Sequence, residues 1–145
     1  VLNREKIKIN LWSLIFSALK SLALFIILDI ILENLLIGLF KFSFPKEIHN
    51  FNFDNAFFIK NFSVLYIEFI IILTLFIIIK PLFSSKLKAS IFLSLIFTIY
   101  TILFSAHFLN FKIISADLYS LFSILTLIEF PLAITAGALS YKDPS

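Results

Sequence analysis

Four long apolar stretches constrain the fold of this chain more than any other feature of its sequence. They cover residues 14–40, 60–79, 89–109 and 118–140. An α-helix needs about 20 predominantly apolar residues to cross the roughly 30 Å of hydrocarbon in a bilayer. Each stretch is long enough, and we therefore predict four membrane-spanning helices.

The overall composition supports this prediction. Of the 145 residues, 61% are hydrophobic and only 14% are charged, and the mean hydropathy is +1.06. Soluble domains have about 45–50% apolar and about 25% charged residues, so a globular body of this size would leave much apolar surface in water. These proportions exclude both a soluble domain and a disordered chain.

Short polar segments, at residues 41–55, 80–88 and 110–117, connect the apolar stretches. Connections of this length place successive helices side by side and antiparallel. The chain has no internal repeat and no interdomain linker, so residues 1–145 are expected to form a single four-span domain. The predicted fold is all-α, a polytopic membrane protein built as an antiparallel four-helix transmembrane bundle.

The distribution of Lys and Arg predicts the orientation of this bundle. Basic residues precede the first span, as in a signal peptide, but no small-residue cleavage site follows, so this span is expected to be retained. Four basic residues then lie on the outer side, and eight lie on the side of the two termini: Arg4, Lys6, Lys8, Lys20, Lys80, Lys86, Lys88 and Lys142. Basic residues concentrate in cytoplasmic flanks, so both termini are expected in the cytoplasm.

The same cytoplasmic flanks account for the net charge of +3, and we predict no nucleic-acid binding. The excess of Phe, Ile, Leu, Lys and Asn is typical of an AT-rich bacterial genome. The expected location is therefore a bacterial cytoplasmic (inner) membrane, with the lipid bilayer as the main partner.

Small residues form stripes on the last two spans. On the fourth, Ala133 and Gly137 share a face with Glu129 and have a small-xxx-small spacing. On the third, five hydroxyl residues fall within an arc of about 80° at 100° per residue: Ser90, Ser94, Thr98, Thr101 and Ser105. Small residues let helices approach closely, so both stripes are predicted helix-packing faces, and the alternative for the hydroxyl stripe is the lining of a polar pathway.

Four acidic residues interrupt the apolar spans: Asp29 and Glu33 in the first, Glu68 in the second and Glu129 in the fourth. Each costs about 2.5–3.5 kcal/mol near mid-membrane, so such residues normally face the interior of a bundle or a water-filled cavity. Counted from the outer ends, Glu33 and Glu68 lie roughly 10 Å deep, and Asp29 and Glu129 roughly 17 Å. We expect two tiers of paired carboxyl groups.

No basic residue of the spans is placed to neutralise these acids. Lys20 lies about 13 Å from Asp29 along the helix axis and on the opposite face. The acids are therefore protonated, hold a cation or meet a basic residue of a partner chain. We favour a structural polar core or a contact with a partner chain; the alternative is ion or proton handling, for which all four acids are the candidate binding residues.

The chain lacks the residues of common catalytic and cofactor motifs. It has no Cys, and its two histidines, His49 and His107, lack the spacing of zinc, di-iron or haem sites. Its two glycines, Gly38 and Gly137, are too far apart to form a phosphate-binding loop. We predict no catalytic residue, no cofactor and no metal site, and hence a protein that is not an enzyme.

Two segments carry a resemblance. The acidic segment Leu28-Asp29-Ile30-Ile31-Leu32-Glu33 of the first span occurs together with a last span that reads Glu129-Phe130-Pro131-Leu132-Ala133 and continues through Ala136-Gly137 to Tyr141-Lys142. In this arrangement the chain resembles small four-span bacterial integral membrane proteins of uncharacterised function. The resemblance implies the fold and brings no activity.

The sequence favours a non-enzymatic accessory or interaction subunit with an acidic polar core, bound to another membrane protein or to further copies of itself. The alternative is a small proton- or cation-coupled transporter that uses its intramembrane carboxyl groups.

Overall fold

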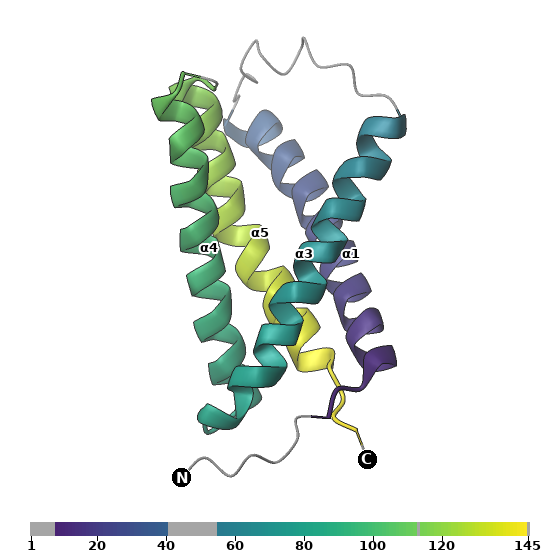
Figure 1. The fold of residues 1–145 in the computed structure, drawn as a ribbon. Coiled ribbons are helices and arrows are strands. Elements are labelled where there is room, and N and C mark those ends of the chain that lie inside the picture. The colour runs from purple at the N-terminus through teal and green to yellow at the C-terminus, as the bar shows by residue number, and fades with distance from the viewer. Residues whose placement is uncertain (1–7, 41–54, 113, 145) are drawn as a thin grey trace.

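The computed structural model describes residues 8–40, 55–112 and 114–144 (Figure 1). Its helices are α1 (Leu11–Phe40), α3 (Asn55–Ile79), α4 (Lys86–Asn110) and α5 (Ala116–Ser140), and a short 3₁₀ turn, η1 (Lys80–Leu82), follows α3. All four α-helices are long and apolar enough to cross a membrane. The predicted all-α, four-helix transmembrane bundle is confirmed.

Three helices begin two or three residues before the apolar stretches that predicted them, because capping side chains set their starts. Ser85 Oγ accepts a hydrogen bond from the N–H of Lys88, 3.2 Å away, at the start of α4. Ser115 Oγ does the same for Leu118 at the start of α5, also at 3.2 Å. Asn10 Oδ1 accepts from the N–H of Ser13 at 3.1 Å, next to the first residue of α1. Hydropathy does not register these polar residues, which satisfy the free N–H groups of a helix N-terminus.

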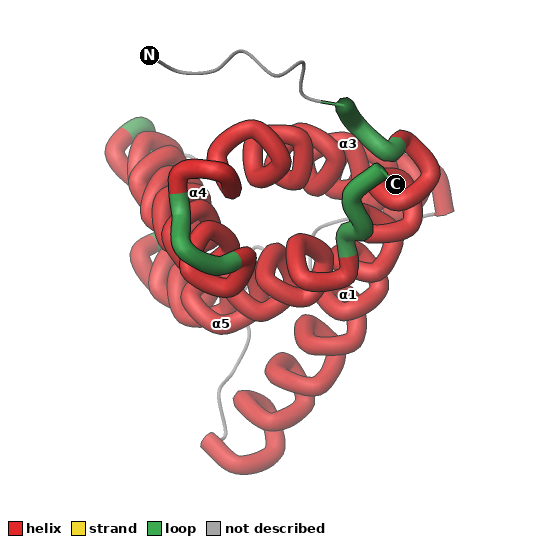
Figure 2. The backbone as a smooth tube through the Cα atoms, turned by 90° about the horizontal axis from the view of Figure 1, so that it is seen from below, coloured by secondary structure: helices red, strands yellow, loops and turns green. Residues whose placement is uncertain are grey.

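The helices contact one another unequally. α5 packs extensively against both α1 and α4, and α3 packs mainly against α1. α3 and α4 are joined through η1 but make few contacts, and Figure 1 shows them separating from this joint toward the opposite end of the bundle. In Figure 2 the C-terminal half of α1 also extends away from the other helices. The bundle is therefore closed at the end where the chain termini lie and spread at the other.

The buried core occupies the closed end. It combines the first halves of α1 and α4 with the second halves of α3 and α5, and includes Leu14, Ala18, Leu73, Phe76, Ala89, Leu93, Ala133, Ile134 and Ala138. The outward side chains of the helices are mostly Ile, Leu and Phe, a surface consistent with contact with lipid. Such a surface is stable only in an apolar solvent, which agrees with four spanning helices.

α1 and α5 make the closest crossing. Ser17, Ala18 and Ser21 of α1 are buried against the small-residue face of α5, and Ser140 Oγ donates to Ser17 Oγ at 3.1 Å. An added Cβ at Gly137 would collide with Ser21 Oγ and would lie 3.0 Å from the carbonyl oxygen of Ser17. Only a residue without a side chain fits this crossing, as is usual where transmembrane helices approach closely.

The hydroxyl stripe of α4 faces inward over its whole length. Ser90, Ser94, Thr98 and Ser105 are buried, and Thr101 is half-buried. Four of these hydroxyls donate to carbonyls of their own helix; Ser94 Oγ donates to that of Ile91 at 2.9 Å, for example, and Ser105 Oγ to that of Ile102 at 2.8 Å. Thr98 Oγ1 is buried and has no hydrogen-bond partner among the described residues. Because the hydrogen bonds of these hydroxyls stay inside α4, the small side chains let neighbouring helices approach closely but do not cross-link them.

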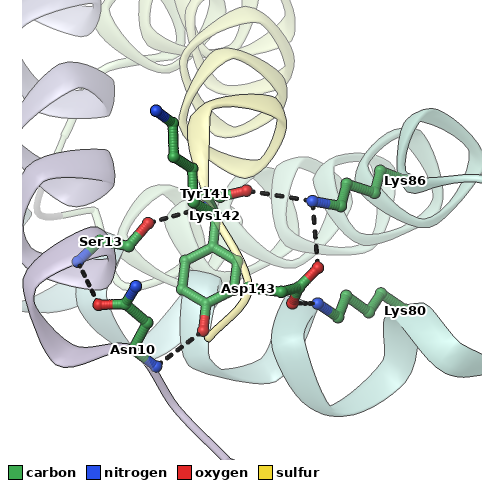
Figure 3. Close-up of polar contacts among 7 residues, drawn as sticks. All are labelled: Asn10, Ser13, Lys80, Lys86, Tyr141, Lys142 and Asp143. Carbon is green, nitrogen blue, oxygen red and sulfur yellow. Dashed lines mark hydrogen bonds and ion pairs between the residues drawn. The ribbon is translucent and has the colours of Figure 1, made fainter. Parts of the chain in front are cut away.

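The end of the chain ties the closed end together (Figure 3). The Tyr141 hydroxyl accepts a hydrogen bond from the N–H of Asn10 at 3.0 Å, and the backbone carbonyl of Tyr141 accepts one from Lys86 Nζ at 3.2 Å. Asp143 forms ion pairs with both Lys80 and Lys86. Lys80 Nζ also lies 5.2 Å from the centre of the Tyr141 ring. The last residues thus join the start of α1 to the α3–α4 connection.

Candidate functional site

A cavity of about 640 Å³ lies in the spread half of the bundle. All four helices contribute to its wall, from Phe25 of α1 and Asn61 of α3 to Phe108 of α4 and Leu118 of α5. Val64, Phe104 and Phe122, which also line it, are between 43% and 50% exposed, so the cavity is open to the surface. Its position follows from the fold, because the helices that close together near the termini diverge here.

Three of the four candidate acids line this cavity: Asp29 from α1, Glu68 from α3 and Glu129 from α5. Glu33 does not. It lies one turn beyond Asp29, nearer the C-terminal end of α1. The deeper tier expected from the sequence, Asp29 and Glu129, meets at the cavity wall, whereas Glu33 and Glu68 do not both face the cavity.

Glu129 is the most deeply placed of these acids. Its side chain lies on the inner face of α5, one turn from Ala133, and is only 3% exposed. Its carboxyl group lies close to that of Asp29. Two neighbouring carboxyl groups repel each other when both are ionised, so such a pair favours holding a proton.

The second oxygen of this carboxyl group, Glu129 Oε1, is buried and has no hydrogen-bond partner among the described residues. A buried acceptor without a partner costs about 1–3 kcal/mol, and more where it carries charge. No Lys, Arg or His occurs among the described residues that line the cavity. The site therefore has acceptor capacity that the described part of the chain leaves unused.

The rest of the wall is mostly aromatic and aliphatic. Phe25 and Phe130, which both line the cavity, contact each other edge to face at 5.4 Å between ring centres. Phe104 and Phe108 contact each other at 5.4 Å on the α4 side. The remaining polar residues of the wall are Asn61, Thr101, Ser105 and Thr126.

A second cavity of about 480 Å³ lies between α3 and α4. It shares four lining residues with the first: Glu68, Thr101, Phe104 and Phe130. Its outer wall includes Ile71 and Tyr100, which are 52% and 61% exposed. The two spaces therefore meet at Glu68, and the smaller one reaches the outer surface of the bundle.

The sequence identified the acids but not their partners. It missed the small residues of α1, Ser17 and Ser21, whose i, i+4 spacing is the signal that would have marked this half of the α1–α5 crossing. It also gave no sign of the cavity, because the Phe side chains of its wall are indistinguishable in sequence from lipid-facing ones.

Comparison of the chain with protein-family models, with curated proteins and with solved structures gave no match. The resemblance to small four-span bacterial membrane proteins accordingly stands on its two segments alone. Within the described residues, no group of three or more His, Cys, Asp or Glu side chains is arranged to hold a metal ion.

Proposed function

We propose that this protein is a small membrane carrier that exchanges protons for cations at the carboxyl pair of Asp29 and Glu129. One observation carries the proposal: Glu129 is only 3% exposed, lines a cavity beside a second acid, and has an oxygen without a partner among the described residues. A carboxyl pair of this kind holds a proton when no cation is present and releases it when a cation binds, because the pair does not readily carry two uncompensated charges.

The orientation expected from the Lys and Arg distribution belongs to this proposal. With both termini in the bacterial cytoplasm, the closed end of the bundle faces the cytoplasm and the cavity faces outward. A reporter that is active only in the periplasm should give a signal when fused at His49 and none when fused at Ser145, and the reverse pattern would contradict the orientation.

The proposal predicts the effect of Glu129→Gln on exchange in proteoliposomes. Vesicles with an acidic interior and an enclosed pH dye would be exposed to external Na⁺, K⁺ or tetraphenylphosphonium, and proton release measured. We expect the release rate to fall at least about tenfold in Glu129→Gln, because the amide carries neither the proton that is released nor the negative charge that attracts the cation.

Asp117→Asn is the matched control, since Asp117 lies on the same helix, is exposed and does not line the cavity. It should release protons at the rate of the unmodified protein. Exchange by Glu129→Gln at the unmodified rate, or no exchange by the unmodified protein with any of the three cations, would contradict the proposal.

A second candidate function is the accessory or interaction subunit expected from the sequence. The observation that favours it is the C-terminal half of α1, where Ile27, Ile30 and Ile31 are about half exposed on a helix segment that extends away from the bundle. Glu33 lies on the same segment and would meet a basic residue of a partner helix. Extraction in mild detergent distinguishes the two: a stoichiometric partner that is lost in Glu33→Gln favours the subunit, and a protein that purifies without one favours the carrier.

A further inference from the structure

The size of the main cavity indicates which class of cation it binds. This inference rests on the proposed function, because it names the substrate class of the same site. Metal cations are held by several oxygen ligands at about 2.0–2.6 Å, and the described residues offer no such cluster. A space of about 640 Å³ falls instead within the range of about 300–1,000 Å³ that is typical of cavities for organic ligands.

The wall chemistry agrees with an organic cation. Five aromatic rings line the cavity, namely Phe25, Phe104, Phe108, Phe122 and Phe130. Aromatic rings bury large apolar groups and attract a cation over their faces. The acids lie on the same wall, and among the described lining residues nothing would neutralise an anion. The combination fits a ligand with a positive charge and a hydrophobic body.

The second cavity supplies an access route for such a ligand. A hydrophobic cation partitions into the bilayer before it meets a membrane protein, and the cleft between α3 and α4 connects the lipid-facing residues Ile71 and Tyr100 with Glu68. α3 and α4 make few contacts with each other, so a ligand can enter this cleft without breaking an extensive helix–helix interface. From Glu68 the shared residues Phe104 and Phe130 lead directly into the main cavity.

We propose that the substrate is a hydrophobic organic cation that enters from the bilayer through the α3–α4 cleft and binds at Glu129. Glu68 is the first acid on this path and attracts the charge at the junction of the two cavities. The Glu129 carboxylate attracts the positive charge of the ligand, and the rings of Phe25 and Phe130 contact its hydrophobic body.

Equilibrium binding to the detergent-solubilised full chain tests the substrate class. The probes are tetraphenylphosphonium, the similarly shaped anion tetraphenylborate and the small cations tetramethylammonium and Na⁺. We expect tetraphenylphosphonium to bind at least about tenfold more tightly than each of the others, since charge and hydrophobic area both contribute. Equal binding of the tetraphenyl cation and anion would overturn the proposal, because it would reflect hydrophobicity alone.

Two variants locate the binding. Glu129→Gln should weaken tetraphenylphosphonium binding about ten- to a hundredfold and leave tetraphenylborate binding unchanged or tighter, because only the charge is removed. Glu68→Gln, at an exposed position, should weaken binding of the cation less but in the same direction. Asp117→Asn should bind like the unmodified protein. Unchanged cation binding in both Gln variants would overturn the assignment of the site.

Binding kinetics test the route. Ile71→Trp adds bulk to the cleft, so association and dissociation of tetraphenylphosphonium should slow by the same factor while the dissociation constant stays the same. Ile67→Trp is the control, since Ile67 is an exposed residue of α3 that lines neither cavity. Equal association rates for the two variants would overturn the route through the cleft.

These outcomes separate the two proposals. Proton release with Na⁺ or K⁺, but no preference for tetraphenylphosphonium, would overturn the substrate class and keep the carrier. Charge-selective tetraphenylphosphonium binding without proton release in vesicles would support the binding site and contradict the exchange.

Discussion

Gly137→Leu should destabilise the protein by about 3 kcal/mol or more. Even an added Cβ would collide with Ser21 Oγ, and it would lie 3.0 Å from the backbone carbonyl of Ser17 and 3.3 Å from Leu73 Cδ1. The serine hydroxyl can rotate but the carbonyl cannot, so α1 and α5 would have to separate. Overpacking costs about 1–3 kcal/mol where neighbours adjust, and more where backbone opposes it.

Unfolding in detergent, followed by circular dichroism, measures this loss. Gly38→Leu is the matched control, because an added Cβ at Gly38 meets nothing within 4 Å. It should leave the unfolding transition within about 0.5 kcal/mol of the unmodified protein, as is usual for exposed positions. If both leucine variants unfold alike, the close crossing of α1 and α5 assigned to Gly137 is wrong.

Tyr141→Ala should lower the free energy of unfolding by about 3–5 kcal/mol, the usual cost of truncating a fully buried aromatic residue. Tyr141 is 1% exposed although it lies just beyond the end of α5, and its ring lies beneath Lys80. The substitution empties the space at which the start of α1, the α3–α4 connection and the chain end meet. Unfolding measured with and without the substitution reports the cost directly.

Tyr141→Phe separates the ring from its hydroxyl. It keeps the buried area and removes only the acceptor of the Asn10 N–H, so it should cost about 0.5–1.5 kcal/mol. A loss in Tyr141→Phe as large as in Tyr141→Ala would mean that the hydrogen bond, rather than the buried ring, holds the chain end in place.

Two of the acids, Asp29 and Glu33, show what the sequence can predict about the site and what it cannot. Asp29 and Glu33 are spaced i, i+4 and share one face of α1, so sequence spacing treats them alike. The structure separates them, because Asp29 lines the main cavity and Glu33 does not. Crossing angles between helices decide this, and they depend on side chains of both partners.

The sequence by itself determined the number of helices, their approximate extents and their alternating direction, because crossing a bilayer requires about 20 apolar residues and short connections leave little freedom. It also determined that acids are present at a depth where they are costly. Each of these properties depends on a single segment of the chain, so the sequence alone is enough to predict them.

Only the tertiary structure decided which residues meet. Gly137 lies at the close crossing of α1 and α5 because Ser17 and Ser21 lie opposite it. Glu129 belongs to the candidate site because it lines the cavity in the half of the bundle where α3 and α4 diverge. The physical reason is that lipid is as apolar as the side chains, so burial does not select which apolar face turns inward. Contacts between small and polar residues on different helices make that choice, and they form only when the helices have assembled.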